Sequence, residues 1–146
     1  MKKDVMICMS GVMASDSDGA VDIICPGEYY FRNGKHFIRY EEKIAEDSLT
    51  TDTMCMFKFD KDSAELTKKG IVNSKLFYEQ GQTHRINYST EYGDFIIGIR
   101  TDAIRLTEEE HELILEIDYV VEFDSAEKNV FHIRIHVSDE PERLLP

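Results

Sequence analysis

The chain has 146 residues, a length typical of one domain that buries enough apolar surface to fold without a disulfide or a metal ion. It carries 17 Lys and Arg against 29 Asp and Glu, a formal charge of −12 that repels phosphate backbones and anionic lipids. The two basic pairs, Lys2-Lys3 and Lys68-Lys69, are too short to reverse this charge locally. We therefore expect neither nucleic acid nor a membrane as a partner.

The N-terminal residues 4–9 alternate like a strand, and their apolar run ends at Ser10-Gly11, too early for a secretory signal. No later stretch approaches the roughly 20 apolar residues that a membrane span requires. An odd number of cysteines without paired spacing predicts no disulfide framework for Cys8, Cys25 and Cys55. We expect a cytoplasmic protein whose thiols lie in or near the core.

Turn signals divide the first two thirds of the chain into strands. The pair Asn33-Gly34 stands between two apolar runs and predicts a type I′ hairpin, because both turn positions need positive φ. Residues 51–59 show the two-residue alternation of a strand. Gly81 and Gly93 lie in the turns that flank another predicted strand, at 84–88.

The clearest alternation covers residues 112–123, where one face is mostly acidic. The face predicted to be buried carries Leu113, Leu115, Ile117, Tyr119, Val121 and Phe123. One buried and one wet face give a strand this period of two, whereas a helix would scatter the carboxylates around its circumference. Residues 131–137 repeat the pattern and complete a C-terminal hairpin. The stretch 102–112, with Thr107 to Glu110, is predicted to be a connection between strands rather than a helical turn.

Regular strands with short turns predict an all-β fold. Long sequential hairpins favour a single antiparallel up-and-down barrel of about eight to ten strands, because closure removes exposed sheet edges. We assign residues 1–138 to this barrel. Residues 139–146 contain two prolines and are predicted to form a frayed C-terminal tail.

Several segments occur in an order that resembles the YwiB-like family of bacterial proteins. They are GKHFIRYEE at 34–42, KKGIVNS at 68–74, YSTEYG at 88–93, IGIRT at 97–101, LEIDY at 115–119 and NVF at 129–131. The resemblance covers most of the chain, although Glu91 stands where some relatives have Pro. It implies a lipocalin-like (calycin-type) barrel of unknown function, and it supplies no catalytic residue.

The five histidines predict no metal site. His132 and His136 share a strand face but lie about 13 Å apart at roughly 3.3 Å per residue, too far to bind one ion without a bend. His36 and His111 adjoin turn signals and are expected to be exposed. His84 heads a strand face, where it is either structural or a contact for a ligand.

No catalytic or cofactor motif is present. The chain contains no Gly-x-Ser-x-Gly elbow, no Walker A loop, no dinucleotide fingerprint and no Cys-x-x-Cys pair. We therefore expect no cofactor and no catalytic residue. An enzyme would need a cleft with a perturbed His84 or a thiolate at Cys55.

The predicted inner face supplies the candidate ligand-binding set: Phe57, His84, Tyr88, Phe95, Ile97, Thr101 and Tyr119. A small apolar or amphipathic molecule would lie among these apolar groups, with His84 or a threonine holding its polar end. In the competing interpretation, the inward hydroxyls of residues such as Thr51, Thr53, Thr90 and Thr101 bond the backbone or fixed water, and side chains fill the barrel.

The alternative function is an interaction or self-assembly module without a small ligand. Apolar residues interrupt otherwise polar faces at Met54, Met56, Ile114 and Val120. If they gathered on one surface, they could form a self-pairing patch, and the protein would be a homodimer.

Overall fold

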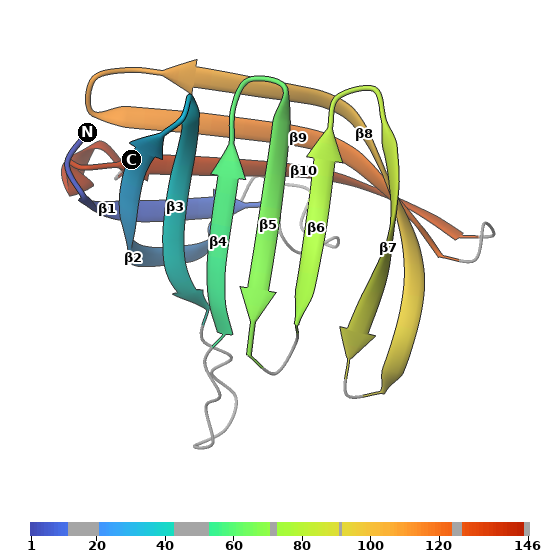
Figure 1. Ribbon diagram of the computed structural model, residues 1–146. Coiled ribbons are helices and arrows are strands. Elements are labelled where there is room, and N and C mark those ends of the chain that lie inside the picture. The colour runs from blue at the N-terminus through green and yellow to red at the C-terminus, as the bar shows by residue number, and fades with distance from the viewer. Residues whose placement is uncertain (12–20, 43–52, 71–72, 91, 124–126, 145–146) are drawn as a thin grey trace.

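The computed structural model is a single ten-stranded sheet that curls into a nearly closed barrel (Figure 1). It describes residues 1–11, 21–42, 53–70, 73–90, 92–123 and 127–144. The strands are β1 Asp4–Ser10, β2 Val21–Arg32, β3 Lys35–Glu42, β4 Thr53–Phe59, β5 Ser63–Lys69, β6 Ser74–Glu79, β7 Thr83–Thr90, β8 Gly93–Glu108, β9 Glu112–Phe123 and β10 Glu127–Ser138. A short 3₁₀ helix, η1, follows at Pro141–Leu144.

The strand order is β6-β5-β4-β3-β2-β1-β10-β9-β8-β7, and every hydrogen-bonded pair is antiparallel. Neighbours in the sheet are neighbours in the chain, except that β1 pairs with β10. The two ends of the chain are therefore joined within the sheet, and the sheet's own edges are β6 and β7. The predicted antiparallel barrel of eight to ten strands is confirmed.

Alternation explains why these segments form strands. In β9, Leu113, Leu115, Ile117 and Tyr119 are buried, and the residues between them are half-buried on the outer face. The first hairpin turn also forms as predicted, because Asn33 and Gly34 both adopt positive φ, 53° and 76°. Asparagine tolerates this conformation better than most side-chain-bearing residues.

β8 is the strand that sequence patterns describe least well. The expected connection at 102–112 is mostly strand, since β8 continues to Glu108 and only residues 109–111 connect it to β9. Its pairing with β9 shifts register between Thr101 and Ala103, which is a β-bulge. Because the bulge adds one unpaired residue to β8, the alternation of inward and outward side chains, which makes β9 recognisable in the sequence, is interrupted here.

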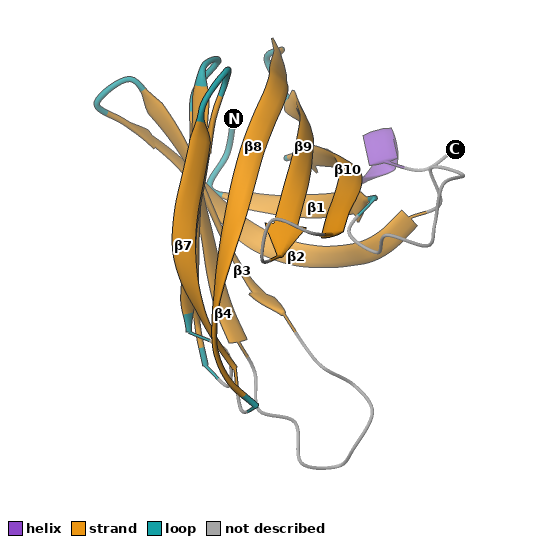
Figure 2. Cartoon of the chain, turned by 90° about the vertical axis from the view of Figure 1, so that its right-hand side faces the viewer, coloured by secondary structure: helices purple, strands orange, loops and turns teal. Residues whose placement is uncertain are grey.

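The barrel closes where β8 meets the turn between β6 and β7. The Gly81 N–H donates to the Thr101 carbonyl at 2.9 Å, and the Thr101 N–H donates to the Gln82 carbonyl at 3.0 Å. The Ile104 N–H donates to Gln80 Oε1 at 2.9 Å. In Figure 2, β8 passes beside β7 and crosses from one wall of the barrel to the other.

One apolar cluster fills the interior. Its fully buried members include Ile7, Ile38, Phe57, Phe59, Ile99, Leu115, Ile117 and Ile135. Strands from every part of the barrel contribute, so the chain from β1 to β10 shares a single core. Among the described residues, no helix is long and apolar enough to cross a membrane.

The C-terminal tail was predicted to begin at Asp139, but the side chain of this residue is held by contacts with the barrel. The Asp139 carboxylate accepts a hydrogen bond from the Lys2 N–H at 2.8 Å and lies 3.1 Å from His111 Nδ1. Its side chain is 1% exposed. Asp139 and Glu140 therefore belong to the end of the barrel rather than to a frayed segment.

Candidate ligand site at the barrel seam

The inner face of β8 and β9 changes from exposed and apolar to buried and polar along its length. On β8 the exposed fraction falls from 46% at Phe95 to 6% at Ile97 and 0% at Thr101. On β9 it falls from 41% at Phe123 to 9% at Tyr119. The ladder pairs Ile97 with Phe123 and Thr101 with Tyr119, so the two gradients run side by side.

Thr101 lies at the buried end of this wall, and its hydroxyl group makes no hydrogen bond with the described residues. Its Oγ1 is buried and has no hydrogen-bond partner among the residues that the structure describes. The backbone of Thr101 is held by Gly81 and Gln82, so the residue is fixed next to the bulge. Since buried hydroxyls almost always have a partner, this group is one that a ligand or a fixed water would satisfy.

Two phenols lie at the same depth. The rings of Tyr78 and Tyr119 meet edge to face with centroids 4.9 Å apart, and Phe131 stacks on Tyr119 at 5.2 Å. Burial raises the pKa of Tyr119, against a smaller opposite effect of its hydrogen bond with Tyr78. Tyr119 therefore keeps its proton and remains a neutral hydrogen-bonding group.

Part of the inner wall near the rings of Tyr78, Tyr119 and Phe131 is exposed to solvent. Besides Phe95 and Phe123, the inner-face side chains that are only partly buried against the core include Leu76, Ile86, Val121 and Phe131. Leu76 and Ile86 lie on β6 and β7, consecutive strands that share no ladder among the described residues, and we call this place the seam. At this seam the described strands are linked by the turn contacts of Gly81 and Gln82 with Thr101 rather than by a ladder.

The structure brings together three of the seven predicted ligand contacts. Ile97, Thr101 and Tyr119 share the buried part of the wall, and Phe95 lies at its exposed end. Phe57 is also buried but belongs to β4, in the core. The Tyr88 backbone pairs with Phe95, while its side chain lies outside the described residues, as do Thr51 and the Thr90 side chain.

His84 lines a hollow of about 210 Å³ together with Phe77, Tyr78 and Glu79, and its role as a ligand contact stays a prediction. Its Nε2 lies 3.1 Å from Glu79 Oε1, and its ring centroid lies 5.7 Å from that of Phe77. These contacts hold His84 against β6 near the turn. Sequence reasoning missed Tyr78, whose ring contacts that of Tyr119. Its position two residues before the Gln80–Gln82 turn was the available signal.

His36 was expected to be exposed, and that prediction is wrong. The residue is 6% exposed and packs against Phe59 with ring centroids 5.3 Å apart. Its Nδ1 lies 2.8 Å from the Tyr29 hydroxyl, and its Nε2 bonds the Glu108 carboxylate. Burial, followed by the charge of Glu108, raises the pKa of Tyr29, so the phenol stays protonated at neutral pH. Both ring nitrogens are satisfied, which marks His36 as structural.

A hollow of about 290 Å³ opens beside this buried histidine, lined by Phe31, Gly34, His36, Asp60, Lys61, Asp62, Leu106 and Glu108. It lies where the β2–β3 and β4–β5 turns approach the end of β8. Three of its polar lining groups are paired: Asp60 binds Lys35 Nζ at 2.6 Å, and Glu108 binds His36. Among the described residues, none that lines this hollow has a buried polar side-chain atom without a hydrogen-bond partner, unlike Thr101.

Cys55 does not have the properties of a nucleophile. Burial and then the charge of Glu42 raise the pKa of its thiol to about 11. A thiol with this pKa is protonated at neutral pH, and the thiolate is the reactive form. All three cysteines are free, with Cys55 buried and Cys8 and Cys25 half-buried.

The outward histidines of β10 engage separate carboxylates. His132 contacts Asp118 and Glu116, at 2.5 and 3.3 Å, and His136 Nε2 lies 3.1 Å from Glu112.

The predicted apolar patch does not form. Met54 and Met56 are half-buried on β4, whereas Ile114 and Val120 lie on β9, on the opposite side of the barrel. Val120 is also only 3% exposed.

Comparison with known proteins supports the fold and gives no activity. A solved structure, "Crystal structure of ywiB protein from Bacillus subtilis", matches with a TM-score of 0.74 over 93% of this chain and 91% of that chain, at 16% identity. No curated protein matches this sequence. The family model described as "Domain of unknown function (DUF1934)" matches residues 7–135. The chain therefore belongs to the DUF1934 family of YwiB-like proteins, whose function is unknown.

Proposed function

We propose that this barrel binds a small, neutral, amphipathic molecule at the seam between β6 and β7. The observation that carries the proposal is the Thr101 hydroxyl, which is buried without a partner at the deep end of a partly uncovered apolar wall. The ligand's apolar part would lie along Phe95, Phe123 and Ile86. Its polar end would bond Thr101 beside the Tyr119 phenol, in the manner of lipocalin-like barrels.

The charge of the site favours a neutral ligand. Thr101 and Tyr119 offer neutral hydroxyls, and the chain as a whole has a formal charge of −12. A buried carboxylate would need a cationic partner to offset its lost hydration, and neither hydroxyl supplies one. We therefore expect an alcohol or a carbonyl compound to bind in preference to a carboxylic acid anion.

A dye-displacement titration tests this. Nile red, a neutral dye, would be displaced from the purified protein by 1-decanol and much less by decanoate. Thr101→Val removes the hydroxyl with little change of shape, and we expect it to weaken decanol binding about tenfold, the effect of one hydrogen bond. Thr53→Val is the matched control, because Thr53 is 2% exposed on the inner face of β4, away from the seam.

Two results would overturn the proposal. In one, wild-type protein fails to bind decanol at all. In the other, Thr101→Val and Thr53→Val weaken decanol binding equally, so that Thr101 has no special role. A preference for decanoate over decanol would contradict the neutral-ligand argument specifically.

Self-association is the second candidate, and exposed apolar residues favour it. Ile96 is 64% exposed and Val130 is 78% exposed, on strands that extend past the core. A homodimer would cover them. Sedimentation of the wild-type protein and of an Ile96→Lys, Val130→Lys double variant tests self-association. A wild-type dimer that is lost in the variant would support self-association, and a monomeric wild type would contradict it.

We also infer a cytoplasmic location. The support is chemical: three thiols, none of them in a disulfide, suit a reducing compartment.

A further inference from the structure

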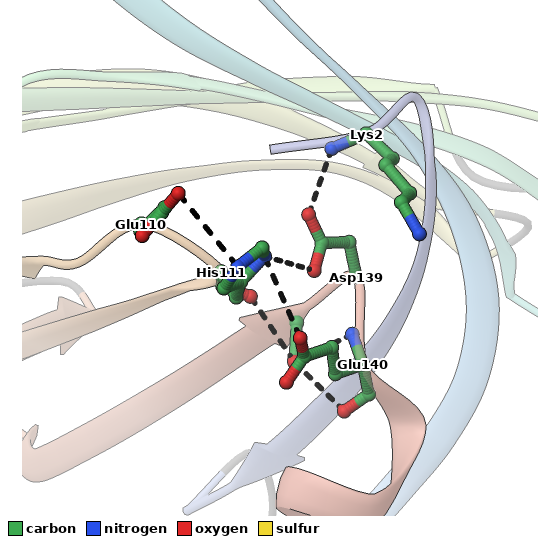
Figure 3. Close-up of polar contacts among 6 residues, drawn as sticks. Lys2, Glu110, His111, Asp139 and Glu140 are labelled. Carbon is green, nitrogen blue, oxygen red and sulfur yellow. Dashed lines mark hydrogen bonds and ion pairs between the residues drawn. The ribbon is translucent and has the colours of Figure 1, made fainter.

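A histidine and two carboxylates converge at the end of the barrel where β10 stops. His111 lies in the connection between β8 and β9, while Asp139 and Glu140 directly follow β10 (Figure 3). His111 Nδ1 is 3.1 Å from Asp139 Oδ1 and 3.7 Å from Glu140 Oε1. One donor atom from each of the three residues lies within 4.8 Å of the others.

The 3.1 Å separation is that of two adjacent ligands of one ion, and the 3.7 Å separation is slightly wider. Bonds of about 2.0–2.2 Å to a metal place two adjacent ligands about 3–3.5 Å apart. The donors are also mixed, one imidazole nitrogen and two carboxylate oxygens, which suits a divalent transition metal ion better than magnesium or calcium. Since His111 and Glu140 are about one third exposed, water can complete the coordination.

The backbone fixes this geometry. The Asp139 N–H donates to the His111 carbonyl at 3.1 Å, and Ser138 Oγ donates to the same carbonyl at 3.2 Å. The Lys2 N–H donates to Asp139 Oδ2 at 2.8 Å, which leaves Oδ1 directed at the imidazole. Asp139 is thus a carboxylate with a 1% exposed side chain and one oxygen reserved for the cluster, unlike an ordinary acidic surface group.

Glu110 acts on the other side of the ring. Its Oε1 lies 3.9 Å from His111 Nε2. When a metal ion replaces the proton on Nδ1, the negative charge of Glu110 would favour a proton on Nε2, so that Nδ1 presents its lone pair to the ion. Outer carboxylates orient metal-binding histidines in this way.

We propose that His111, Asp139 and Glu140 form a binding site for a divalent transition metal ion such as Zn²⁺. The ion would replace the proton that His111 and Asp139 otherwise share. It would tie the β8–β9 connection to the end of β10, so we expect a stabilising role that is independent of the seam.

The surface cluster around His132 provides a control for the proposed metal site. It also contains a histidine and two carboxylates, but each ring nitrogen faces a different acid: Nδ1 faces Asp118 and Nε2 faces Glu116. Arg105 Nη1 also lies 2.9 Å from Asp118 and offsets its charge. No single ring nitrogen has both acids beside it, so this cluster should not chelate.

Calorimetric titration of the full-length protein with ZnCl₂ tests the proposal. We expect one Zn²⁺ per chain, Kd at least tenfold weaker in His111→Ala and Glu140→Gln, and no change in His132→Ala. Glu140→Gln keeps the side-chain shape, so it decides the question if His111→Ala fails to fold. Magnesium should bind at least tenfold more weakly than zinc.

Substitution of Co²⁺ for Zn²⁺ separates this site from the cysteines, because thiolate ligation produces an intense charge-transfer band. Absence of that band, together with weakened binding in His111→Ala, supports the proposal. It is overturned if wild-type protein binds no Zn²⁺, if His111→Ala and Glu140→Gln both bind like wild type, or if the cobalt complex shows thiolate ligation.

Discussion

The barrel is closed in two places by different means. Between β1 and β10 the closure is a backbone ladder of five residue pairs, with Ile7 and Ile135 fully buried beneath it. Where β6 and β7 diverge, the closure consists of turn contacts from Gln80 to Gln82 onto β8. The first closure combines cooperative hydrogen bonding with a complete core. The second leaves the inner-face aromatics Phe95 and Phe123 partly exposed, and it is the place where the proposed ligand would bind.

The largest expected loss of stability follows from a substitution beneath the β1–β10 ladder. Ile135→Ala removes a side chain with 0% exposure and should lower the free energy of unfolding by about 2–5 kcal/mol. Urea denaturation measures it. The same change at Ile86, half-buried on β7, should cost clearly less. Equal losses at the two positions would mean that the closures do not differ in packing.

The next largest expected change in stability is pH-dependent and arises from Asp60, in the β4–β5 turn beside β8. Burial alone would raise the pKa of Asp60, but hydrogen bonds from Lys35, Asp62 and Ser63 outweigh it and lower that pKa to about 2. Because folding favours the ionised form, the stabilisation is complete above the ordinary carboxyl pKa near 4 and is lost as the pH falls toward 2.

Asp60→Asn should therefore cost about 1–2 kcal/mol at pH 7, allowing for partial solvent screening. The difference from wild type should shrink as the pH falls from 4 to 2. Urea denaturation at several pH values measures both quantities. A difference that stays constant over this range would show that the charge of Asp60 is not responsible.

A smaller effect is expected at the seam. Gln80→Ala removes the acceptor for the Ile104 N–H and should lower stability by about 0.5–1.5 kcal/mol. Hydrogen exchange of the Thr101 and Ile104 amides should accelerate while exchange in the β1–β10 ladder stays slow. Acceleration in both regions would show that the two closures open together.

The smallest effect is at Thr101. Thr101→Val removes a buried hydroxyl that has no partner among the described residues, so stability should be unchanged or rise by about 1 kcal/mol. Thermal unfolding without added ligand measures it. A loss of 1 kcal/mol or more would mean that the hydroxyl has a structural partner after all, and the argument for a ligand would lose its basis.

The sequence predicts those parts of the molecule that depend on local periodicity. β9 and β10 follow from alternation, and the Asn33-Gly34 turn follows from φ preference. The Gln80 contact with Ile104 joins residues 24 positions apart, and His36 meets Glu108 across 72 positions. The β8 bulge depends on pairing with β9, so no local pattern signals any of these features. For the site, alternation places Ile97, Thr101 and Tyr119 on one face, but the seam that exposes their wall depends on tertiary closure.

Native mass spectrometry of protein purified from cells is the most direct measurement of the seam site. We expect wild-type chain to carry a discrete additional mass that is absent after denaturation, retained in Thr53→Val and lost in Thr101→Val. A bare wild-type chain, or an additional mass equally present in Thr101→Val, would contradict ligand binding at the seam.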